Sequence, residues 1–519
     1  MATHHLVLDR PAGAPQPAPK RQSLYAPRKK IYPKRASGRF RRFKWLVMLV
    51  TLAIYYVTPW IRWDRGPGAP DQAVLVDLAN RRFFFFFIEI WPQEFYYVAG
   101  MLVMAGIGLF LVTSTVGRAW CGYACPQTVW VDLFLVVERA IEGDRNARMK
   151  LEAAPWSFDK LWKRTLKHGI WLLIGVATGG AWIYYFADAP TLLQQVVTLQ
   201  APVVAYGTIA LLTATTYVFG GLMREQVCTY MCPWPRIQGA MLDENSLTVT
   251  YNDWRGEPRS RHAKKALAEG KAVGDCVDCD ACVVVCPMGI DIRNGQQLEC
   301  ITCALCIDAC DDVMTKLGKE TGLISYVTLA DYNRNMALAT GGGPTVIPAN
   351  VRDATGRLVE TIKHTNWRSI VRPRTVVYFL GWTAIGLAML TALSLRTTFS
   401  VSVLHDRNPL YVVLKDGAIR NGFDVKITNM APHVRSVSVH VEGLPGAVVY
   451  GAEGASSPST TLDLTVDADK VADQRLYVEV PVGSLPKSVP APLEIVVTDA
   501  EGQATARAQT VFQAPEASK

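Results

Sequence analysis

The chain has no cysteine after Cys310, although it continues to Lys519, and all twelve cysteines lie between Cys121 and Cys310. A disulfide within the C-terminal part is therefore excluded. Charged residues are also scarce, at 19% of 519, whereas 50% of the residues are hydrophobic and fourteen are tryptophan. This composition excludes one ordinary soluble domain. It indicates membrane spans joined to soluble parts, in a chain long enough for three or four structural units.

Several signals of other protein classes are missing. No apolar core follows Met1 at the distance of a cleavable signal peptide. Residues 1–44 are rich in Pro, Ala, Lys and Arg and are predicted to form a flexible cytoplasmic tail. Gly341–Pro344 precede no Lys-Ser or Lys-Thr helix start, so no phosphate loop is indicated, and nothing marks a flavin site. The net charge of +9 concentrates beside apolar stretches, which favours membrane orientation over nucleic-acid binding.

Five apolar segments each approach the roughly 20 residues that a helix needs to cross a bilayer. They are Trp45–Trp60, Phe95–Thr115, Ile170–Phe186, Pro202–Met223 and Val376–Leu395. Lys and Arg are abundant in the tail and in the 118–167 and 224–374 regions, and absent from 187–201. Because positive residues stay inside, we expect five spans with the N-terminus inside and the C-terminus outside.

The chain is accordingly divided into five parts. After the tail come a four-span region (45–233), a cytoplasmic insert (234–374), a fifth transmembrane helix (375–396) and a periplasmic domain (397–519). The first outer connector contains the aromatic block Phe83–Phe87, which is typical of interfacial anchoring. Glu89 and Glu94 beside it are interpreted either as solvated interface charges or as a cation entry point, since carboxylates beside a span are costly unless used.

Two runs with the spacing C-x2-C-x2-C-x3-C lie in the insert. The first contains Cys276, Cys279, Cys282 and Cys286, and the second contains Cys300, Cys303, Cys306 and Cys310. Two residues between thiolates let the backbone wrap one face of a cubane, and the fourth thiolate of each run binds the other cluster. The sequence thus predicts two [4Fe–4S] clusters. One is bound by Cys276, Cys279, Cys282 and Cys310, and the other by Cys300, Cys303, Cys306 and Cys286.

The alternatives to clusters are a pair of zinc sites or disulfides. Zinc sites usually have two C-x2-C halves with a longer loop between them. Pro287 closes the first run as in bacterial ferredoxins, whereas Asp311 stands where the second proline would be. The grouped cysteines also indicate a reducing compartment. The tandem spacing therefore favours clusters.

A second cysteine pattern occurs twice at the ends of predicted spans. Cys121 and Cys125 precede Pro126, Cys228 and Cys232 precede Pro233, and both pairs read C-x-Y-x-C-P. Residues four apart lie on one helix face, and the proline breaks or kinks the helix. Four such thiolates form a soft ligand set that suits Cu(I), zinc or an Fe–S cluster. Inert buried cysteines are the alternative.

Residues 397–519 alternate apolar and polar side chains in about seven short strands separated by Gly, Pro and Asn. This pattern predicts an immunoglobulin-like β-sandwich in which Val and Leu replace the usual disulfide. Isolated histidines on strands are usually solvent-facing, although a metal site of His405, His433 and His440 is the alternative. His262 and His364 in the insert are interpreted as surface residues.

Four segments resemble the CcoG family of cytochrome c oxidase accessory proteins, also called FixG or RdxA. They are Trp91–Tyr97, Trp120–Trp130, Glu142–Arg148 and Asp291–Gly295. The resemblance covers nearly the whole chain. It implies an inner-membrane protein with two [4Fe–4S] clusters that supports assembly of a cbb-type oxidase and reduces Cu(II) to Cu(I) for its copper centre.

Two functions follow as expectations. In the first, a cupric reductase passes electrons from a cytoplasmic donor through the clusters to copper at Cys121, Cys125, Cys228 and Cys232. In the second, an assembly scaffold docks oxidase subunits or copper chaperones through the immunoglobulin-like domain. Electron delivery to a quinone or flavin partner is a third alternative. The sequence leaves the donor unspecified and a homodimer open.

Overall fold

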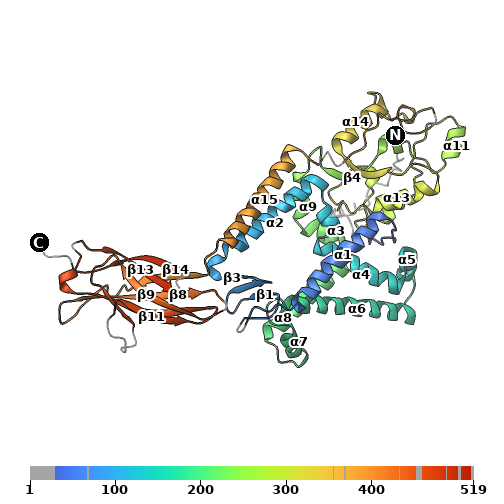
Figure 1. Ribbon diagram of the computed structural model, residues 1–519. Coiled ribbons are helices and arrows are strands. Elements are labelled where there is room, and N and C mark those ends of the chain that lie inside the picture. The colour runs from blue at the N-terminus through green and yellow to red at the C-terminus, as the bar shows by residue number, and fades with distance from the viewer. Residues whose placement is uncertain are drawn as a thin grey trace, which may run out of the picture.

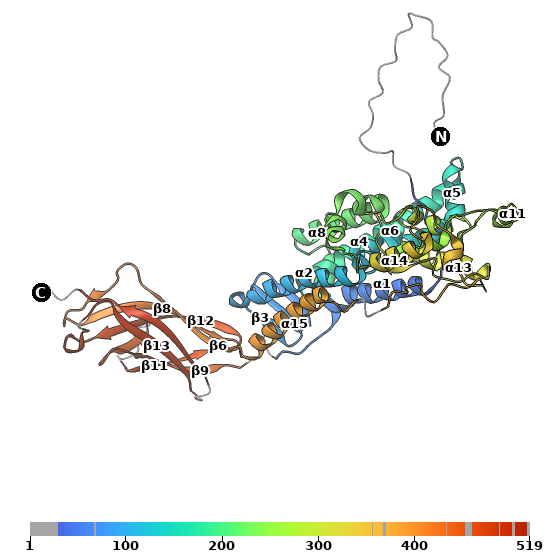
Figure 2. The ribbon, with the colours of Figure 1, turned by 90° about the horizontal axis from the view of Figure 1, so that it is seen from above.

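The computed structural model describes residues 30–66, 69–354, 356–366, 370–431, 433–451, 459–486, 488–500 and 504–515. The chain forms three parts in a row (Figure 1). A bundle of long helices lies in the middle, the cysteine-rich part lies at one end, and a β-sandwich lies at the other. Figure 2 shows the same order from above, so the cysteine-rich part and the sandwich are separated by the length of the helices.

Four helical segments are long and apolar enough to cross a membrane among the described residues: Arg39–Trp60, Pro92–Val116, Val203–Met223 and Pro373–Ser394. They contain α1 (Arg39–Val57), α2 (Tyr96–Val116), α8 (Val203–Thr216) and α15 (Pro373–Ser394). The predicted third span lies in α6 (Phe158–Ile183), whose first half carries Lys160, Lys163, Arg164 and Lys167. A count of five spans is therefore not confirmed.

Helix α6 approaches α8 closely through two glycines. A Cβ at Gly179 would lie 2.9 Å from the Ile209 backbone, and a Cβ at Gly175 would lie 3.2 Å from Thr213. Two small residues four apart let helices pack in this way within a membrane. Helices α2 and α15 also pack side by side (Figure 1). The remaining helices of this part are α3 (Ala119–Tyr123), α4 (Pro126–Glu142), α5 (Arg145–Ala153), α7 (Ala189–Val197) and α9 (Trp234–Met241).

The first part of the aromatic block belongs to a small sheet, and the interpretation of the block as an interfacial anchor is wrong for Phe84. Strands β1 (Val74–Asp77), β2 (Arg82–Phe85) and β3 (Ile88–Ile90) pair antiparallel. Phe84 is 1% exposed, under the guanidinium of Arg65, whereas Phe87 is 74% exposed. The sheet lies beside the C-terminal end of α6, where the Val76 amide donates to the Tyr185 carbonyl at 2.8 Å.

The predicted tail to residue 44 also differs from the structure in its described part, residues 30–44. Helix α1 begins at Arg39, and Arg41 and Lys44 are 6% and 3% exposed. Arg41 Nη1 donates to Asp132 Oδ1 of α4 at 2.8 Å. Two of the basic residues expected to anchor topology are thus buried between helices. Residues 1–29 lie outside the described residues.

The cysteine-rich part is built on a two-stranded antiparallel sheet of β4 (Leu247–Tyr251) and β5 (Ile324–Thr328). Its buried core combines cysteines with Val249, Ile307, Met314 and Ile324. The helices around it are α10 (Asp253–Gly256), α11 (Ala263–Ala268), α12 (Ala281–Val284), α13 (Leu305–Lys316) and α14 (Leu329–Thr340).

The C-terminal part is a sandwich of two sheets with strand orders β10-β12-β8-β6 and β11-β9-β13-β14, and β7 pairs with β8. Phe423, Ile427, Val478, Ile495 and Phe512 are fully buried in its core. Seven of these strands were predicted, and β10 and β14 were not. The strands are β6 (Phe399–His405), β7 (Val412–Val413), β8 (Ile419–Asn429), β9 (Arg435–Glu442), β10 (Val448–Gly451), β11 (Thr461–Val466), β12 (Lys470–Val480), β13 (Ala491–Asp499) and β14 (Thr505–Phe512).

Candidate iron–sulfur and membrane thiol site

The eight cysteines of the two runs divide between two neighbouring cavities. The first cavity is lined by Cys276, Cys279, Cys282 and Cys310, together with the apolar side chains of Met314, Leu323 and Ile324. The second is lined by Cys286, Cys300, Cys303 and Cys306, with Cys282 on the shared wall. The fourth cysteine of each run therefore lies with the first three of the other run. These two sets fit two cubane clusters.

The two cysteine loops repeat one backbone conformation. Asp278 and Asp280 in the first loop, and Thr302 and Ala304 in the second, have φ values between 51° and 59°. They stand at the same two positions of each run. Left-handed residues curl a backbone so that its N–H groups form an anion-binding concavity, as a thiolate-ligated cluster requires.

Arg293 stabilises the conformation of the first loop through three hydrogen bonds. Its guanidinium donates to Asp278 Oδ1 at 2.7 Å, to Asp280 Oδ1 at 2.6 Å and to Asp291 Oδ2 at 2.7 Å. Sequence reasoning assigned this arginine no role. The signal that marked it was its place in the segment Asp291–Gly295.

Burial in these cavities raises the pKa of Cys282, Cys286 and Cys310 to about 12. The thiols are therefore protonated until a metal binds and displaces the protons. Among the described residues, no three His, Cys, Asp or Glu side chains lie close enough to hold a single metal ion.

In each of the two membrane cysteine pairs, the helix that contains the first cysteine ends before the second. Cys121 is in α3 and Cys125 precedes α4, whereas Cys228 is in a π-helix, η4 (Val227–Met231), and Cys232 follows it. Pro126 starts α4 and Pro233 caps α9. The prolines therefore begin the next helix, where their missing N–H costs nothing.

The four membrane thiols are neighbours in space. Burial, with lesser contributions from Cys125 and Cys232, raises the pKa of Cys121 to about 11. Burial, Cys125 and Cys121 raise that of Cys228 to about 12. The Cys121 thiol also donates to Oε1 of the fully buried Gln238 at 3.0 Å, a contact without a sequence signal.

Helix α3 is packed directly against the second cysteine loop. Cys121 and Cys303 belong to one buried apolar cluster with Ile301 and Leu305. A Cβ at Gly122 would lie 2.6 Å from the Ile301 carbonyl oxygen, and the Tyr123 hydroxyl donates to the Cys303 carbonyl at 3.2 Å. The membrane thiols and the second cysteine cavity are thus adjacent.

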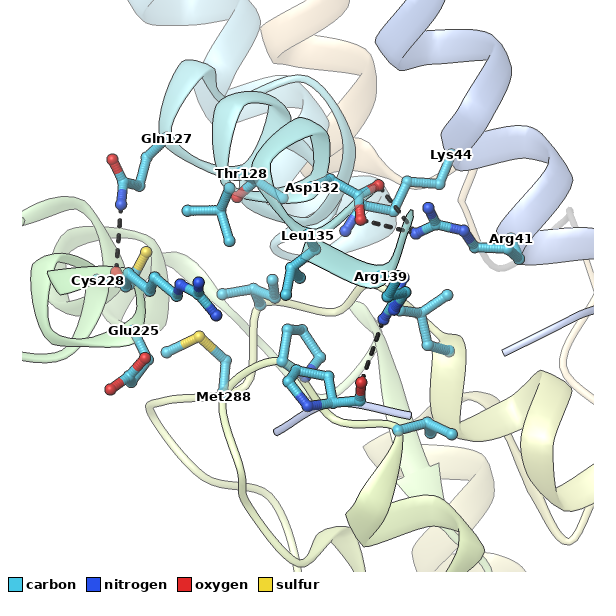
Figure 3. A pocket seen from close by; sticks show the side chains of 17 residues that line it. Arg41, Lys44, Gln127, Thr128, Asp132, Leu135, Arg139, Glu225, Cys228 and Met288 are labelled. Atoms are coloured by element: carbon cyan, nitrogen blue, oxygen red, sulfur yellow. Dashed lines mark hydrogen bonds and ion pairs between the residues drawn. The ribbon is translucent and has the colours of Figure 1, made fainter. Parts of the chain in front are cut away.

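A narrow cavity continues from this region to Cys228 (Figure 3). In Figure 3, Cys228 and Glu225 lie opposite the α4 side chains of Thr128 and Asp132, and Met288 lies beside them. Met288, Ile301 and Leu305 line both this cavity and the second cysteine cavity. The cavities therefore form a row in which each shares a wall with the next.

The remaining candidate residues, which are histidines and two glutamates, do not come together in one site within the described part of the chain. His405 Nε2 lies 2.8 Å from Asn421 Oδ1, whereas His440 lies beside Glu442 on the other sheet. His262 and His364 are exposed. Glu94 is 6% exposed and lies 3.6 Å from Arg396, so its interpretation as a solvated charge is wrong. Glu89 lies 3.1 Å from Arg82.

Comparison with known proteins agrees with this geometry. Residues 223–329 match the family "4Fe-4S dicluster domain" and residues 98–142 match "4Fe-4S binding domain". Residues 389–515 match the immunoglobulin-like fold at the C-terminus of FixG. The chain therefore contains iron–sulfur cluster domains and an immunoglobulin-like C-terminal domain, as predicted.

Three curated proteins are similar over most of their length. The chain is 68% identical over 464 residues to the "Nitrogen fixation protein FixG" of Rhizobium meliloti, covering 89% of this chain and 88% of that one. It is 52% identical to "Protein RdxA" of Cereibacter sphaeroides, covering 90% and 92%, and 52% identical to "Protein RdxB" of the same organism, covering 89% and 91%. The predicted resemblance is confirmed: this chain belongs to the FixG/RdxA family of membrane-associated iron–sulfur proteins.

Proposed function

We propose that this chain is a membrane electron-transfer protein that reduces Cu(II) to Cu(I) for the copper centre of a cbb-type cytochrome c oxidase. Bound [4Fe–4S] clusters supply reversible one-electron chemistry. Cys276, Cys279, Cys282 and Cys310 would hold one, and Cys286, Cys300, Cys303 and Cys306 the other. The observation that carries the proposal is the packing of Cys121 against Cys303, which joins the second cysteine cavity to the membrane thiols.

Copper is the substrate at Cys121, Cys125, Cys228 and Cys232. Each Cu(II) ion takes one electron, and thiolates stabilise the product because soft ligands favour Cu(I). Gln127 supports this arrangement by joining α4, which follows Cys125, to the segment that precedes Cys228. Its Nε2 donates to the Phe219 carbonyl at 2.8 Å and to the Arg224 carbonyl at 3.2 Å.

The proposed topology keeps five spans, with the N-terminus and clusters in the cytoplasm and the sandwich in the periplasm. Contacts between α1 and α6 support the assignment of α6 as a span. The Tyr55 hydroxyl of α1 donates to the Thr178 carbonyl at 2.8 Å, and the Tyr185 hydroxyl donates to the Tyr55 carbonyl at 3.0 Å. The apolar end of α6 therefore reaches the same level as the end of α1. An inner-membrane location follows from this topology.

The test uses purified protein with pre-reduced clusters under anaerobic conditions. Addition of Cu(II) should reoxidise the clusters, followed by EPR, and should form Cu(I), followed with a Cu(I)-specific chelator. Replacing the four membrane cysteines by serine should abolish copper binding while the cluster signal persists. Clusters that stay reduced in the presence of Cu(II) would refute the proposal.

A matched pair of glycine variants tests the route. Gly122→Val pushes α3 away from the Ile301 carbonyl and should slow reoxidation by Cu(II) without loss of iron. Gly180→Val is the control, because only the Tyr184 hydroxyl, at 3.9 Å, lies near its Cβ position.

A second candidate is an assembly scaffold, in which the clusters are structural or regulatory. The observation that favours it is the place of the sandwich, which projects away from the helices and the cysteine-rich part (Figure 2). Its surface is then open to oxidase subunits or copper chaperones. A variant without Thr397–Lys519 discriminates between the functions. Lost oxidase assembly with intact copper reduction would favour the scaffold.

A further inference from the structure

A cavity of about 370 Å³ lies beside the membrane thiols and has no role in the proposed copper chemistry. It lies between α4, α6, the π-helix η3 (Tyr217–Met223) and the segment Lys30–Tyr32. Its volume is within the range of roughly 300–1,000 Å³ that small-molecule sites have. Arg224 and Glu225 line both this cavity and the narrow cavity of Cys228. It therefore extends the row of cavities by one.

The cations around this cavity are already neutralised by carboxylates. Arg164 lies 2.6 Å from Glu152, Lys167 lies 2.6 Å from Glu142, and Arg224 lies 3.0 Å from Glu138. Lys30 lies 3.0 Å from Glu152. A phosphate or another anion would have to break these pairs in order to bind. The charge balance thus favours a neutral ligand that accepts hydrogen bonds.

The inner wall of the cavity includes one buried aromatic side chain, Trp171. Trp171 is 2% exposed, stacks on Phe134 with ring centroids 5.2 Å apart, and closely approaches Gly221. Trp171 therefore offers a flat conjugated ring a rigid apolar contact, beside the Lys167 and Arg224 cations that lie 5.1 and 5.3 Å from its ring centroid.

The polar edge includes His168. Its Nδ1 lies 3.0 Å from the Tyr217 hydroxyl, and within the described chain its Nε2 has no hydrogen-bond partner. Burial, with Lys167 as the next cause, lowers the pKa of His168. A neutral imidazole whose Nδ1 accepts from Tyr217 presents an N–H donor at Nε2.

The cavity stands where a ligand can arrive from the lipid. Helix η3 ends the apolar segment Val203–Met223, and Leu222 is 42% exposed at that end. Short π-helices inside such a segment frequently occur at functional sites.

We propose that this cavity binds the head group of a membrane quinone, with a ring carbonyl accepting from His168 Nε2–H, the ring against Trp171 and the isoprenoid chain leaving past Leu222. The inference rests on the proposed electron-transfer function and names the chemical class of a donor. The reduced form, a quinol, would be oxidised to the quinone with release of two protons, and its two electrons would reduce two Cu(II) ions to Cu(I). The proposal places a lipid-soluble carrier of electrons beside Cys228, in addition to any cytoplasmic protein partner.

The test measures binding of decylubiquinone to the purified full-length protein in detergent by isothermal titration calorimetry. We expect one saturable site per chain. His168→Gln should weaken binding about tenfold, which corresponds to about 1.4 kcal/mol, and Leu222→Trp should block binding by filling the mouth. The control is Lys163→Gln, since Lys163 is on the same helix but pairs with Asp159 outside the cavity. Iron content and circular dichroism establish that each variant is folded.

Absence of saturable binding, or equal affinity in the wild type and His168→Gln, would overturn the proposal. Displacement of the quinone by anionic phospholipid but not by a quinone analogue would also overturn it and would assign the cavity to a lipid head group. A photoreactive azidoquinone gives an answer independent of variant folding. Labelling must fall on α6 or η3 peptides of the wild type, and labelling confined to other helices would contradict the site. Because binding needs no copper, failure of the copper assay leaves this test intact.

Discussion

At the residue scale, the assignment of cysteines to cavities makes a sharp prediction about iron content. Cys310 lines a cavity with Cys276, whereas Cys300 lines the other. Anaerobically prepared protein should contain about eight iron atoms, as two cubanes require. The double variant Cys310→Ser/Cys276→Ser should retain about four, because both changes remove the same cluster. Cys310→Ser/Cys300→Ser should lose nearly all.

Iron and acid-labile sulfide analysis reads out both variants, and wild-type protein from the same preparation is the control. Equal iron loss in the two double variants would contradict the crossed assignment. Zinc in place of iron would remove the basis of the proposed function.

The buried pair of Arg41 and Asp132 makes a second prediction at this scale. Their side chains are 7% and 4% exposed. Burial tends to raise the pKa of Asp132, but Lys44 and Arg41 outweigh it and hold that pKa below its usual value. Arg41→Met leaves the carboxylate poorly compensated and should cost about 3–5 kcal/mol. A lowered thermal midpoint of the full chain checks this expectation.

Arg42→Met is the matched control, because Arg42 follows Arg41 in α1 but is exposed. The two variants should differ clearly in thermal midpoint. An Arg41→Met protein as stable as Arg42→Met would show that the carboxylate finds another partner. The stabilisation by Asp132 should also decline as pH falls through its lowered pKa, since a protonated carboxyl no longer pairs with Arg41.

The cysteine spacing was sufficient to predict which thiols share a cavity, because that spacing is set by cluster geometry. The spacing was not sufficient to predict which residues contact those thiols and their loops. Gln238 reaches Cys121 from a helix more than a hundred residues later in the chain, and Arg293 ties together two aspartates of another loop. Such contacts depend on tertiary packing, which no local pattern reports.

At the scale of elements, the packing of α6 against α8 depends on glycine. Gly179→Leu should separate the two helices, because even a Cβ there would lie 2.9 Å from the Ile209 Cα atom and carbonyl oxygen. Overpacking of this kind costs about 1–3 kcal/mol, occasionally more. The yield of monodisperse protein and its thermal midpoint should both fall. Gly180→Leu on the neighbouring face should leave both nearly unchanged, and equal loss in the two variants would contradict this packing.

Element boundaries show why hydropathy is an incomplete guide. Helix α6 begins at Phe158, well before the apolar segment at Ile170, and its charged first turns carry no hydropathy signal. Alternation found seven strands of the sandwich. It missed β10, which has four residues, and β14, whose Thr-Ala-Arg-Ala-Gln-Thr sequence contains few large apolar residues. The strand β2 was missed because a continuous aromatic run has no alternation to detect, and β3 was missed because it has only three residues.

At the scale of the whole molecule, the sandwich is joined to the helices through a group of charges. Arg82 of β2 lies 3.1 Å from Glu89, pairs with Asp469 and donates to the Asp469 carbonyl at 2.8 Å. Arg396, after α15, donates to the Glu89 carbonyl at 2.7 Å and lies 3.6 Å from Glu94. The orientation of the sandwich relative to the membrane part therefore depends on carboxylates that share two arginines.

This junction is expected to respond to pH. Burial and the neighbouring Asp469 carboxylate raise the pKa of Glu89 to about 7, although Arg82 and Arg396 act in the opposite direction. In the unfolded chain this pKa is near 4.5. The folded state therefore binds the proton more tightly, and the stabilisation that this proton provides is lost as pH rises through about 7. Glu89→Gln mimics the protonated side chain and should remove the effect.

We expect the thermal midpoints of the wild type and Glu89→Gln to be similar at about pH 5 and the variant to be more stable at about pH 8. Glu442→Gln is the control, because that exposed carboxylate on the sandwich pairs with Arg507, which lowers its pKa. It should give no gain at the higher pH. If Glu89→Gln shifted the midpoint equally at both pH values, the carboxyl would act by packing and the junction between the two parts would not sense pH.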